Sequence, residues 1–284
     1  MRILDEQYVS HDRVYQQGDI RPTIEALDIL SNQSHIYGTI LTPGGKKGVK
    51  HPCAVLLHGY PGHTSTFDIA QALRRAGVVA VSLFYRGCWG SEGMYTLSGL
   101  IDDAVAAATW MRNEKTAEQY AVDRNAIFFI GHSMGGFAAI NATRRLSWIR
   151  GTALLAPYDF SALMQQGHDE AVKELLASGA NVLRVQRVDD LYDDAKQCYN
   201  AGYGFTHAYD DLKDRNVYFI GAARDDIAPV QVMIEPLWEQ LKRHHSPAVQ
   251  QYDVLDADHG FDEARLTVSA GLVRWMQEVL THVV

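Results

Sequence analysis

Six short apolar runs, separated by helical patterns and turns, restrict the possible folds of this 284-residue chain more than any other feature. Uninterrupted apolar runs of this kind are typical of strands that are buried on both faces of a parallel sheet. Strands that alternate with helices through short connections form right-handed crossovers. The pattern therefore predicts an α/β fold with a mostly parallel, doubly wound sheet. The runs are residues 53–57, 78–84, 126–130, 151–155, 217–220 and 249–255.

The first 50 residues contain two extended runs, at residues 23–30 and 35–41, which are separated by turn residues. These runs predict an antiparallel lead-in to the sheet. Ser98 is expected to be the N-cap of a helix with an apolar face. Two further helices are predicted over residues 133–145 and 264–281.

The stretch from Pro157 to about Arg215 is longer than a single crossover helix requires, and it is helical in parts, at residues 169–177 and 189–199. An insertion of this length in a compact domain is usually a lid or a binding element. A surface connection with no role in substrate binding is the alternative. We therefore predict a core formed by residues 1–156 and 216–284. A helical cap is inserted into it at residues 157–215.

The motif that carries chemical information is Gly-His-Ser-Met-Gly at residues 131–135. The bare G-x-S-x-G pattern is weak, but here it follows an apolar run and opens a predicted helix, as a nucleophile elbow requires. Its glycines leave room for a strained turn, and the N-terminus of the helix favours developing negative charge. We therefore predict that Ser133 is a nucleophile. A glycine-rich turn with an inert serine is the alternative.

A serine nucleophile needs a base and a residue that orients the base. Of the twelve histidines, His259 lies just after the last predicted strand, in a loop expected at the edge of the sheet beside Ser133. Asp225 and Asp226 follow an earlier strand, which gives the chain order Ser, Asp, His that accompanies a nucleophile elbow. Spacing alone leaves both aspartates open as the third member.

Acyl transfer also needs two N–H groups that stabilise an oxyanion. One is expected from Met134, the residue after the nucleophile. The other is expected from the loop at residues 58–62, where the proline has no N–H and Tyr60 is the natural donor. His58 and His63 have no carboxylate or cysteine at ligand spacing, so no metal site is predicted.

Five segments together resemble the α/β-hydrolase superfamily: HGYPG, FYRGCWGSEG, GHSMGG, RDDIAP and DADHGF. Over about residues 35–284, the chain is similar to the prolyl oligopeptidase and dienelactone hydrolase branch and to bacterial cinnamoyl and feruloyl esterases. The resemblance implies an α/β-hydrolase fold. It favours Asp225 over Asp226 and supports Tyr60 and Met134 as oxyanion donors. In the R-G-x-G-x-S-x-G loop of the family one residue precedes the middle glycine, whereas two residues do so here, Cys88 and Trp89.

These features predict a serine carboxylesterase that hydrolyses small to medium carboxylic esters, including aryl or hydroxycinnamoyl esters, through an acyl-enzyme. Trp89, Tyr158 and Phe261 are expected to bind the substrate, with ordinary core packing as the alternative for each. A small serine peptidase or acyl-peptide hydrolase is the alternative enzyme. A non-catalytic ligand-binding member of the fold is the alternative of another class.

The net charge and the cysteines of the chain indicate which binding partners and which cellular compartment to expect for the protein. A net charge of −8 does not provide the basic surface that nucleic acid requires, and no basic amphipathic stretch predicts binding to an anionic membrane. Cys53, Cys88 and Cys198 form neither a disulfide framework nor a zinc motif. No signal peptide or membrane span is recognisable, which favours the cytoplasm. The expected partner is a small-molecule ester, no cofactor is expected, and a homodimer is compatible with the sequence.

Overall fold

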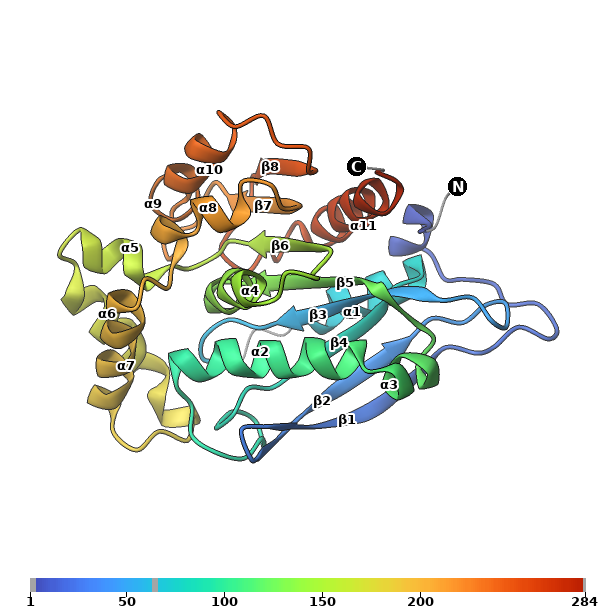
Figure 1. Cartoon of the computed structure of the whole chain (residues 1–284), viewed down its shortest axis with the longest axis horizontal. Helices are drawn as coiled ribbons and strands as arrows, with labels where there is room; N and C mark the ends of the chain where they lie inside the picture. The colour runs from blue at the N-terminus through green and yellow to red at the C-terminus, as the bar shows by residue number, and fades with distance from the viewer. Residues whose placement is uncertain (1–3, 63–65, 283–284) are drawn as a thin grey trace.

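The computed structural model of the chain describes residues 4–62 and 66–282. Within them, eight strands form one sheet in the order β1-β2-β4-β3-β5-β6-β7-β8 (Figure 1). β1 and β2 form an antiparallel hairpin, β2 is antiparallel to β4, and the strands from β4 to β8 run parallel. The predicted lead-in and the mostly parallel sheet are therefore confirmed. The strands are β1 (Thr23–Ser31), β2 (Ser34–Thr42), β3 (His51–Leu57), β4 (Val79–Leu83), β5 (Val122–His132), β6 (Gly151–Leu155), β7 (Val217–Ala222) and β8 (Gln250–Leu255).

Helices cover both faces of the sheet, as a doubly wound fold requires (Figure 1). Helices α1 and α11 contact each other on one face, and α2 and α4 contact each other on the opposite face. The α-helices are α1 (Phe67–Ala76), α2 (Leu97–Arg112), α3 (Glu114–Gln119), α4 (Met134–Arg145), α5 (Phe160–Gln165), α6 (Asp169–Gly179), α7 (Val188–Asn200), α8 (Tyr209–Leu212), α9 (Val230–Met233), α10 (Glu235–Leu241) and α11 (Arg265–Thr281). Short 3₁₀ helices are η1 (Glu6–Val9), η2 (Ala180–Val182) and η3 (Phe205–His207).

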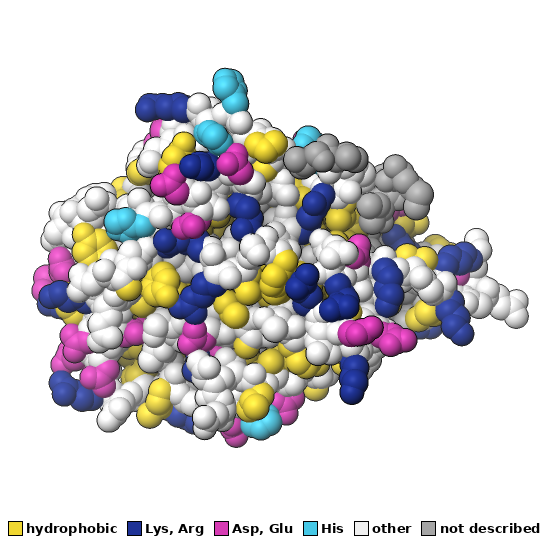
Figure 2. Space-filling model, in the orientation of Figure 1, with side chains coloured by type: hydrophobic (Ala, Val, Ile, Leu, Met, Phe, Trp, Pro, Cys, Tyr) yellow, Lys and Arg dark blue, Asp and Glu magenta, His cyan; other side chains and the backbone are white. Residues whose placement is uncertain are grey.

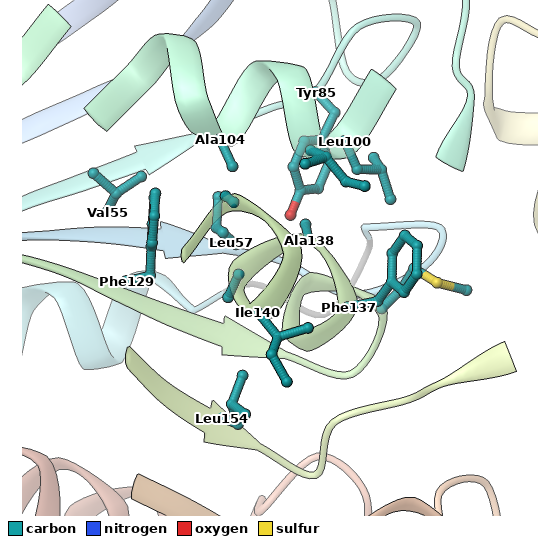
Figure 3. Close-up of a cluster of buried hydrophobic side chains, with 14 of the residues drawn as sticks. Val55, Leu57, Tyr85, Leu100, Ala104, Phe129, Phe137, Ala138, Ile140 and Leu154 are labelled. Carbon is teal, nitrogen blue, oxygen red and sulfur yellow. The ribbon is translucent and has the colours of Figure 1, made fainter. Parts of the chain in front are cut away.

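The central strands are apolar because both of their faces are buried. In β3, Cys53, Val55 and Leu57 belong to the core beneath α2 and α4. Ala54 and Leu56 belong to a second core beneath α1 and α11. This alternation follows from the two-residue period of a strand. Figure 3 shows the first core, in which side chains of β3, β5 and β6 meet those of α2 and α4.

The N-terminus of α2 differs from the prediction. Thr96 is the N-cap: its backbone is extended, at φ −143° and ψ 153°, and its Oγ1 accepts the N–H of Gly99 at 3.0 Å. Ser98 lies inside the first turn, and its hydroxyl donates to Asp194 of α7 at 2.7 Å. The prediction for Ser98 is wrong because both hydroxyl residues are good caps and the preceding loop decides which one lies at the boundary.

Within the segment predicted as an insert, residues 157–215, helices α5, α6 and α7 lie at the end of the sheet toward which β3 and β6 point (Figure 1). The last residues of the segment return to the other end of the sheet, where Arg215 donates to the carbonyl of Ile149 just before β6. The helices predicted at residues 169–177 and 189–199 correspond to α6 and α7. Two distant parts of the insert meet at the buried carboxylate of Asp159, which accepts the N–H of Ser161 at 3.0 Å and that of Phe205 at 2.8 Å. A hydrogen bond therefore closes the base of the insert between residues that are 46 positions apart.

The surface carries charges of both signs. In Figure 2, Lys and Arg side chains are interspersed with Asp and Glu side chains over the face in view. Some charged side chains of the molecule are paired, such as Arg144 with Asp211 at 2.7 Å and Arg145 with Asp102 at 2.6 Å. Across residues 4–62 and 66–282, none of the helices combines the length and the apolar character that crossing a bilayer requires.

Candidate active site

Ser133 lies at a sharp turn between β5 and α4. Its backbone has φ 54° and ψ −124°, and non-glycine residues rarely adopt a positive φ. Glycines allow the neighbouring segments to approach one another closely. A Cβ at Gly131 would lie 2.2 Å from the carbonyl oxygen of Gly135, and a Cβ at Gly135 would lie 2.0 Å from that of Leu57. The motif therefore has the strand–turn–helix geometry of a nucleophile elbow.

Three loops at the carboxyl ends of parallel strands bring Ser133, Asp225 and His259 together. Ser133 follows β5, Asp225 follows β7 and His259 follows β8. The Nε2 of His259 lies 2.9 Å from the Oγ of Ser133, and its Nδ1 lies 2.7 Å from the Oδ2 of Asp225. The imidazole is therefore placed to accept the serine proton while a carboxylate binds its other nitrogen.

Asp225 is held in place by its own loop. Its side chain is buried, and its Oδ1 accepts the N–H groups of Ile227 at 2.9 Å and Ala228 at 2.8 Å. Burial alone would raise the pKa of Asp225, but hydrogen bonds from His259 and from these two N–H groups outweigh burial and hold the pKa below its usual value. Asp225 is therefore ionised at neutral pH, whereas its neighbour Asp226 is exposed to solvent.

The loop after β3 lies directly against Ser133. A Cβ at Gly59 would lie 2.8 Å from the Cβ of Ser133, so this approach requires glycine. The backbone N–H groups of Tyr60 and Met134 donate to no acceptor within the described ranges, which leaves both free to bind an oxyanion. The hydroxyl of Tyr60 donates to the carbonyl of Leu176 in α6 and thereby attaches this loop to the insert.

A cavity of about 360 Å³ opens beside Ser133. Tyr158, which was expected to bind substrate, lines it, and the backbone N–H of Tyr158 donates to the carbonyl of Ser133 at 2.9 Å. His132, in a variable position of the G-x-S-x-G motif, also lines the cavity, although no role was predicted for it. Sequence reasoning missed further residues of the lining: Leu175 and Ser178 on α6, Ile227 after β7 and Asp262 after β8. No motif marks these positions, and only the nearness of Ile227 to Asp225 and of Asp262 to His259 pointed toward the site.

Trp89 and Phe261 lie outside the lining of this cavity. Phe261 is fully buried in the core beneath α1 and α11, where its side chain cannot reach a substrate, so its predicted role is corrected. The indole of Trp89 is next to Gly62, and 44% of the Trp89 surface is exposed. Both residues have positive φ, 46° for Trp89 and 55° for Phe261, which few non-glycine residues adopt.

A buried histidine supports the loop after β3. The Nδ1 of His58 donates to the carbonyl of Gly59 at 2.7 Å, and its Nε2 lies 3.8 Å from the Sγ of Cys88. Burial lowers the pKa of His58 to about 4, so the ring is neutral at neutral pH. His63 lies outside the described residues. Among the residues that the structure describes, no group of three or more His, Cys, Asp or Glu side chains is arranged to hold a metal ion.

Comparison with known proteins places this geometry in a family context. A model of the alpha/beta hydrolase family matches residues 54–273, a range that contains Ser133, Asp225 and His259. A search of curated protein sequences finds no match to the chain.

Solved structures with a similar fold include three esterases. The Pyrococcus furiosus esterase Pf2001 is 19% identical, with a TM-score of 0.62, over 89% of this chain and 93% of that chain. Est1E from Butyrivibrio proteoclasticus is 16% identical, with a TM-score of 0.64, over 90% of this chain and 98% of that chain. Brefeldin A esterase, described as a bacterial homologue of human hormone-sensitive lipase, is 18% identical, with a TM-score of 0.63, over 96% of this chain and 81% of that chain. At these identities, the likeness shows a shared fold.

Proposed function

Because the chain belongs to the alpha/beta hydrolase family, we propose that it is a serine carboxylesterase in which Ser133, His259 and Asp225 form a catalytic triad. One observation carries this proposal. The Oγ of Ser133 lies 2.9 Å from the Nε2 of His259, and the Nδ1 of the same ring lies 2.7 Å from the Oδ2 of Asp225. Acyl transfer by a serine needs these three parts: a nucleophile, a base and a carboxylate that orients the base.

In the proposed reaction, the Oγ of Ser133 attacks the ester carbonyl carbon while the Nε2 of His259 accepts the hydroxyl proton. Asp225 stabilises the imidazolium that results. The N–H groups of Tyr60 and Met134 stabilise the negative charge on the former carbonyl oxygen, and each such donor lowers the barrier by about 3 kcal/mol. The imidazolium then protonates the leaving alkoxide as its C–O bond breaks, which leaves an acyl-enzyme.

Hydrolysis of the acyl-enzyme uses the same groups with water as the nucleophile. His259 accepts a proton from the attacking water and returns it to the Oγ of Ser133 when the acyl–oxygen bond breaks. The products are an alcohol from the first half of the reaction and a carboxylic acid from the second.

The size and the lining of the cavity support small to medium carboxylic esters as substrates. The cavity has a volume of about 360 Å³, and the apolar side chains of Leu175 and Ile227 line it together with Tyr158. Apolar and aromatic linings of this kind bind apolar groups, with a few polar atoms fixing the orientation. Est1E is described with ferulic acid bound, which makes aryl and hydroxycinnamoyl esters suitable members of a first substrate panel.

We also propose that the insert is a cap on a core formed by residues 1–156 and 216–284. Helix α6 of the insert contributes Leu175 and Ser178 to the cavity. The carbonyl of Leu176 accepts the hydroxyl of Tyr60, which belongs to the loop with a proposed oxyanion donor. These contacts would let the insert limit the size of the acyl group and support the catalytic loop.

Turnover of a short p-nitrophenyl ester by Ser133→Ala tests the proposal. We expect the activity to fall by roughly 10⁴-fold or more, with an unchanged urea unfolding curve, because the nucleophile is lost. Labelling by a fluorophosphonate probe should disappear as well. Ser178→Ala, which removes another serine hydroxyl from the same cavity, is the matched control and should retain activity and labelling. Undiminished turnover by Ser133→Ala would refute the triad.

A second measurement separates an esterase from a small peptidase. We expect p-nitrophenyl acetate to be hydrolysed much faster than an aminoacyl p-nitroanilide, because amides are the harder substrates. Faster turnover of the anilide, with both activities lost in Ser133→Ala, would contradict a carboxylesterase while leaving the triad intact.

A further inference from the structure

The residue before Ser133 is a histidine whose ring is buried beside the site. His132 is the last residue of β5, and only 2% of its surface is exposed. Its Nε2 lies 2.8 Å from the backbone carbonyl oxygen of His259. Because a carbonyl oxygen can only accept, the Nε2 of His132 must carry a hydrogen and donate it. This bond joins the strand that precedes the nucleophile to the backbone of the base.

The other ring nitrogen of His132 has no polar partner among the residues that the structure describes. Its Nδ1 is buried and makes no hydrogen bond within the described ranges, and a Cβ at Gly59 would lie 3.4 Å from it. The ring centroid is 5.0 Å from that of His259. Burial and the repulsion from His259 lower the pKa of His132 to about 4. The ring is therefore a fixed neutral donor at neutral pH and does not act as a general acid or base.

The position of His259 in the sheet explains why such a donor matters. His259 follows β8, the last strand of the sheet, and β6 and β7 separate β8 from β5. The ring of His259 is bound by Asp225, and the carbonyl of Gly260 accepts from Arg265 at 3.0 Å. Asp225, Arg265 and His132 thus all contact the loop after β8 that contains His259. Among these three contacts, the hydrogen bond from His132 connects the loop to β5, the strand that precedes Ser133.

We infer that His132 is a positioning residue that keeps the imidazole of His259 at hydrogen-bond distance from Ser133. The inference rests on the proposed function and adds a residue to it. Because a displacement of about 1 Å can slow a well-oriented reaction by roughly 100-fold, loss of the donor should slow the chemical step more than it weakens substrate binding.

Kinetics of three variants test this inference. His132→Leu fills the space without a donor, His132→Asn is polar but too short to reach the carbonyl, and His132→Gln restores an N–H at similar reach. With p-nitrophenyl butyrate, we expect kcat to fall roughly 10- to 100-fold in the Leu and Asn variants at nearly unchanged KM. The Gln variant should recover most of this loss. His245→Leu removes an exposed histidine, serves as the control and should match the wild type.

Two kinetic outcomes would overturn the inference. One is a wild-type kcat in both the Leu and the Asn variants. The other is a Gln variant as slow as the Leu variant. Equal rates with and without an N–H donor at residue 132 would show that the hydrogen bond to the carbonyl of His259 does not affect kcat. If His132→Leu does not fold by circular dichroism, the comparison of Asn with Gln decides.

A second readout does not depend on ester turnover. The proton between the Nδ1 of His259 and the Oδ2 of Asp225 should give a low-field NMR signal in the wild type and in His132→Gln. In the Leu and Asn variants, we expect this signal to be lost or shifted. A signal that is unchanged in all variants, or absent from the wild type, would overturn the inference. A wild type that shows the signal but neither hydrolyses esters nor reacts with a fluorophosphonate would refute the proposed function alone.

Discussion

At the scale of single residues, two adjacent aspartates have very different surroundings. Asp225 is 7% exposed and receives two backbone N–H groups from its own loop, which leaves its Oδ2 for His259. Asp226 is exposed to solvent. Spacing in the sequence could not distinguish them, because both lie in one loop after β7. The family resemblance favoured Asp225, and the geometry gives the physical basis for that choice.

Replacing each aspartate by asparagine provides a matched pair. We expect Asp225→Asn to lower kcat for a p-nitrophenyl ester by up to about 10⁴-fold, because the amide no longer holds the imidazole in the required tautomer. Asp226→Asn should leave kcat within about twofold of the wild type, since its side chain is exposed and surface changes of this kind have small effects. Equal losses in the two variants would contradict the assignment of Asp225.

The side chains around the cavity were harder to predict than the residues that are proposed to react. Ser133 and His259 are marked by motifs and by their position after strands, and the chemistry restricts their residue types. Trp89 and Phe261 also lie in loops near the site, yet neither side chain lines the cavity. The sequence does not reveal which side chains of a loop face a cavity and which pack into the core. Proximity along the chain was therefore a poor guide to the lining.

At the scale of elements, the junction of β5 and α4 depends on close packing against β3. A Cβ at Gly135 would lie 2.0 Å from the backbone oxygen of Leu57, which cannot move without displacing a central strand. The sequence could predict this strand–turn–helix unit because its glycines, apolar run and helical pattern agree. The sequence could not predict that Gly135 packs against β3 rather than against another strand.

Gly135→Ala and Gly167→Ala test this close packing. We expect Gly135→Ala to lower the free energy of unfolding by about 3 kcal/mol, because the added methyl group overpacks a buried contact. Gly167 has open space around its Cβ position and φ +78°, so Gly167→Ala should cost about 1 kcal/mol from backbone strain alone. Urea unfolding measures both values, and the reverse order would show that α4 and β3 are not closely packed.

Among the elements of the insert, α6 forms one wall of the cavity. The sequence predicted both α6 and α7 as helices but could not say which one faces the site. Two contacts settle the position of α6: the hydroxyl of Tyr60 donates to the carbonyl of Leu176, and a Cβ at Gly179 would lie 2.5 Å from the Tyr60 ring. The orientation depends on contacts between segments that are distant in sequence, which local helical patterns do not encode.

Shortening a side chain of α6 should change the acyl preference. We expect Leu175→Ala to raise kcat/KM for long-chain p-nitrophenyl esters relative to the acetate by on the order of 10-fold, because the cavity gains room for methylene groups. Glu174→Ala changes the neighbouring exposed residue of the same helix and is the matched control. A series of esters from acetate to octanoate measures the effect. The same profile in both variants would argue against α6 as the acyl wall.

At the scale of the whole molecule, the class of the sheet could be predicted but its strand order could not. Uninterrupted apolar runs indicate strands with two covered faces. That β4 lies between β2 and β3 depends on a pairing of distant segments, from Gly38 with Leu83 to Leu41 with Ala80. A Cβ at Gly38 would lie 2.2 Å from the carbonyl oxygen of Ser82. The sequence shows that residue 38 is a glycine, but it does not show which neighbouring strand packs closely against it.

The buried histidines should make the whole fold sensitive to acid. The pKa values of His58 and His132 are lowered by burial to about 4 from the ordinary 6.5. Between these values the unfolded chain binds more protons than the folded chain. The contribution of these two rings to the free energy of unfolding is therefore fully present above about pH 6.5 and is lost as the pH is lowered toward 4, by roughly 2 kcal/mol per histidine at pH 5.

Urea unfolding at pH 7.5 and pH 5 measures this loss. His58→Gln should remove about half of the contribution that the two histidines make, whereas the exposed His245→Gln should leave the pH dependence unchanged. A pH dependence of His58→Gln equal to that of the wild type would show that the ring of His58 is not buried in the neutral form.

The closed base of the insert has a consequence for how such a protein can diversify. Because the carboxylate of Asp159 binds the N–H of Phe205, the intervening chain leaves the fold and returns to it at nearly the same place. Segments whose ends already meet can be lengthened, shortened or exchanged at small entropic cost to the remainder. We therefore expect that exchange of this one segment can alter the substrate preference of the proposed esterase, while Ser133, Asp225 and His259 keep their positions.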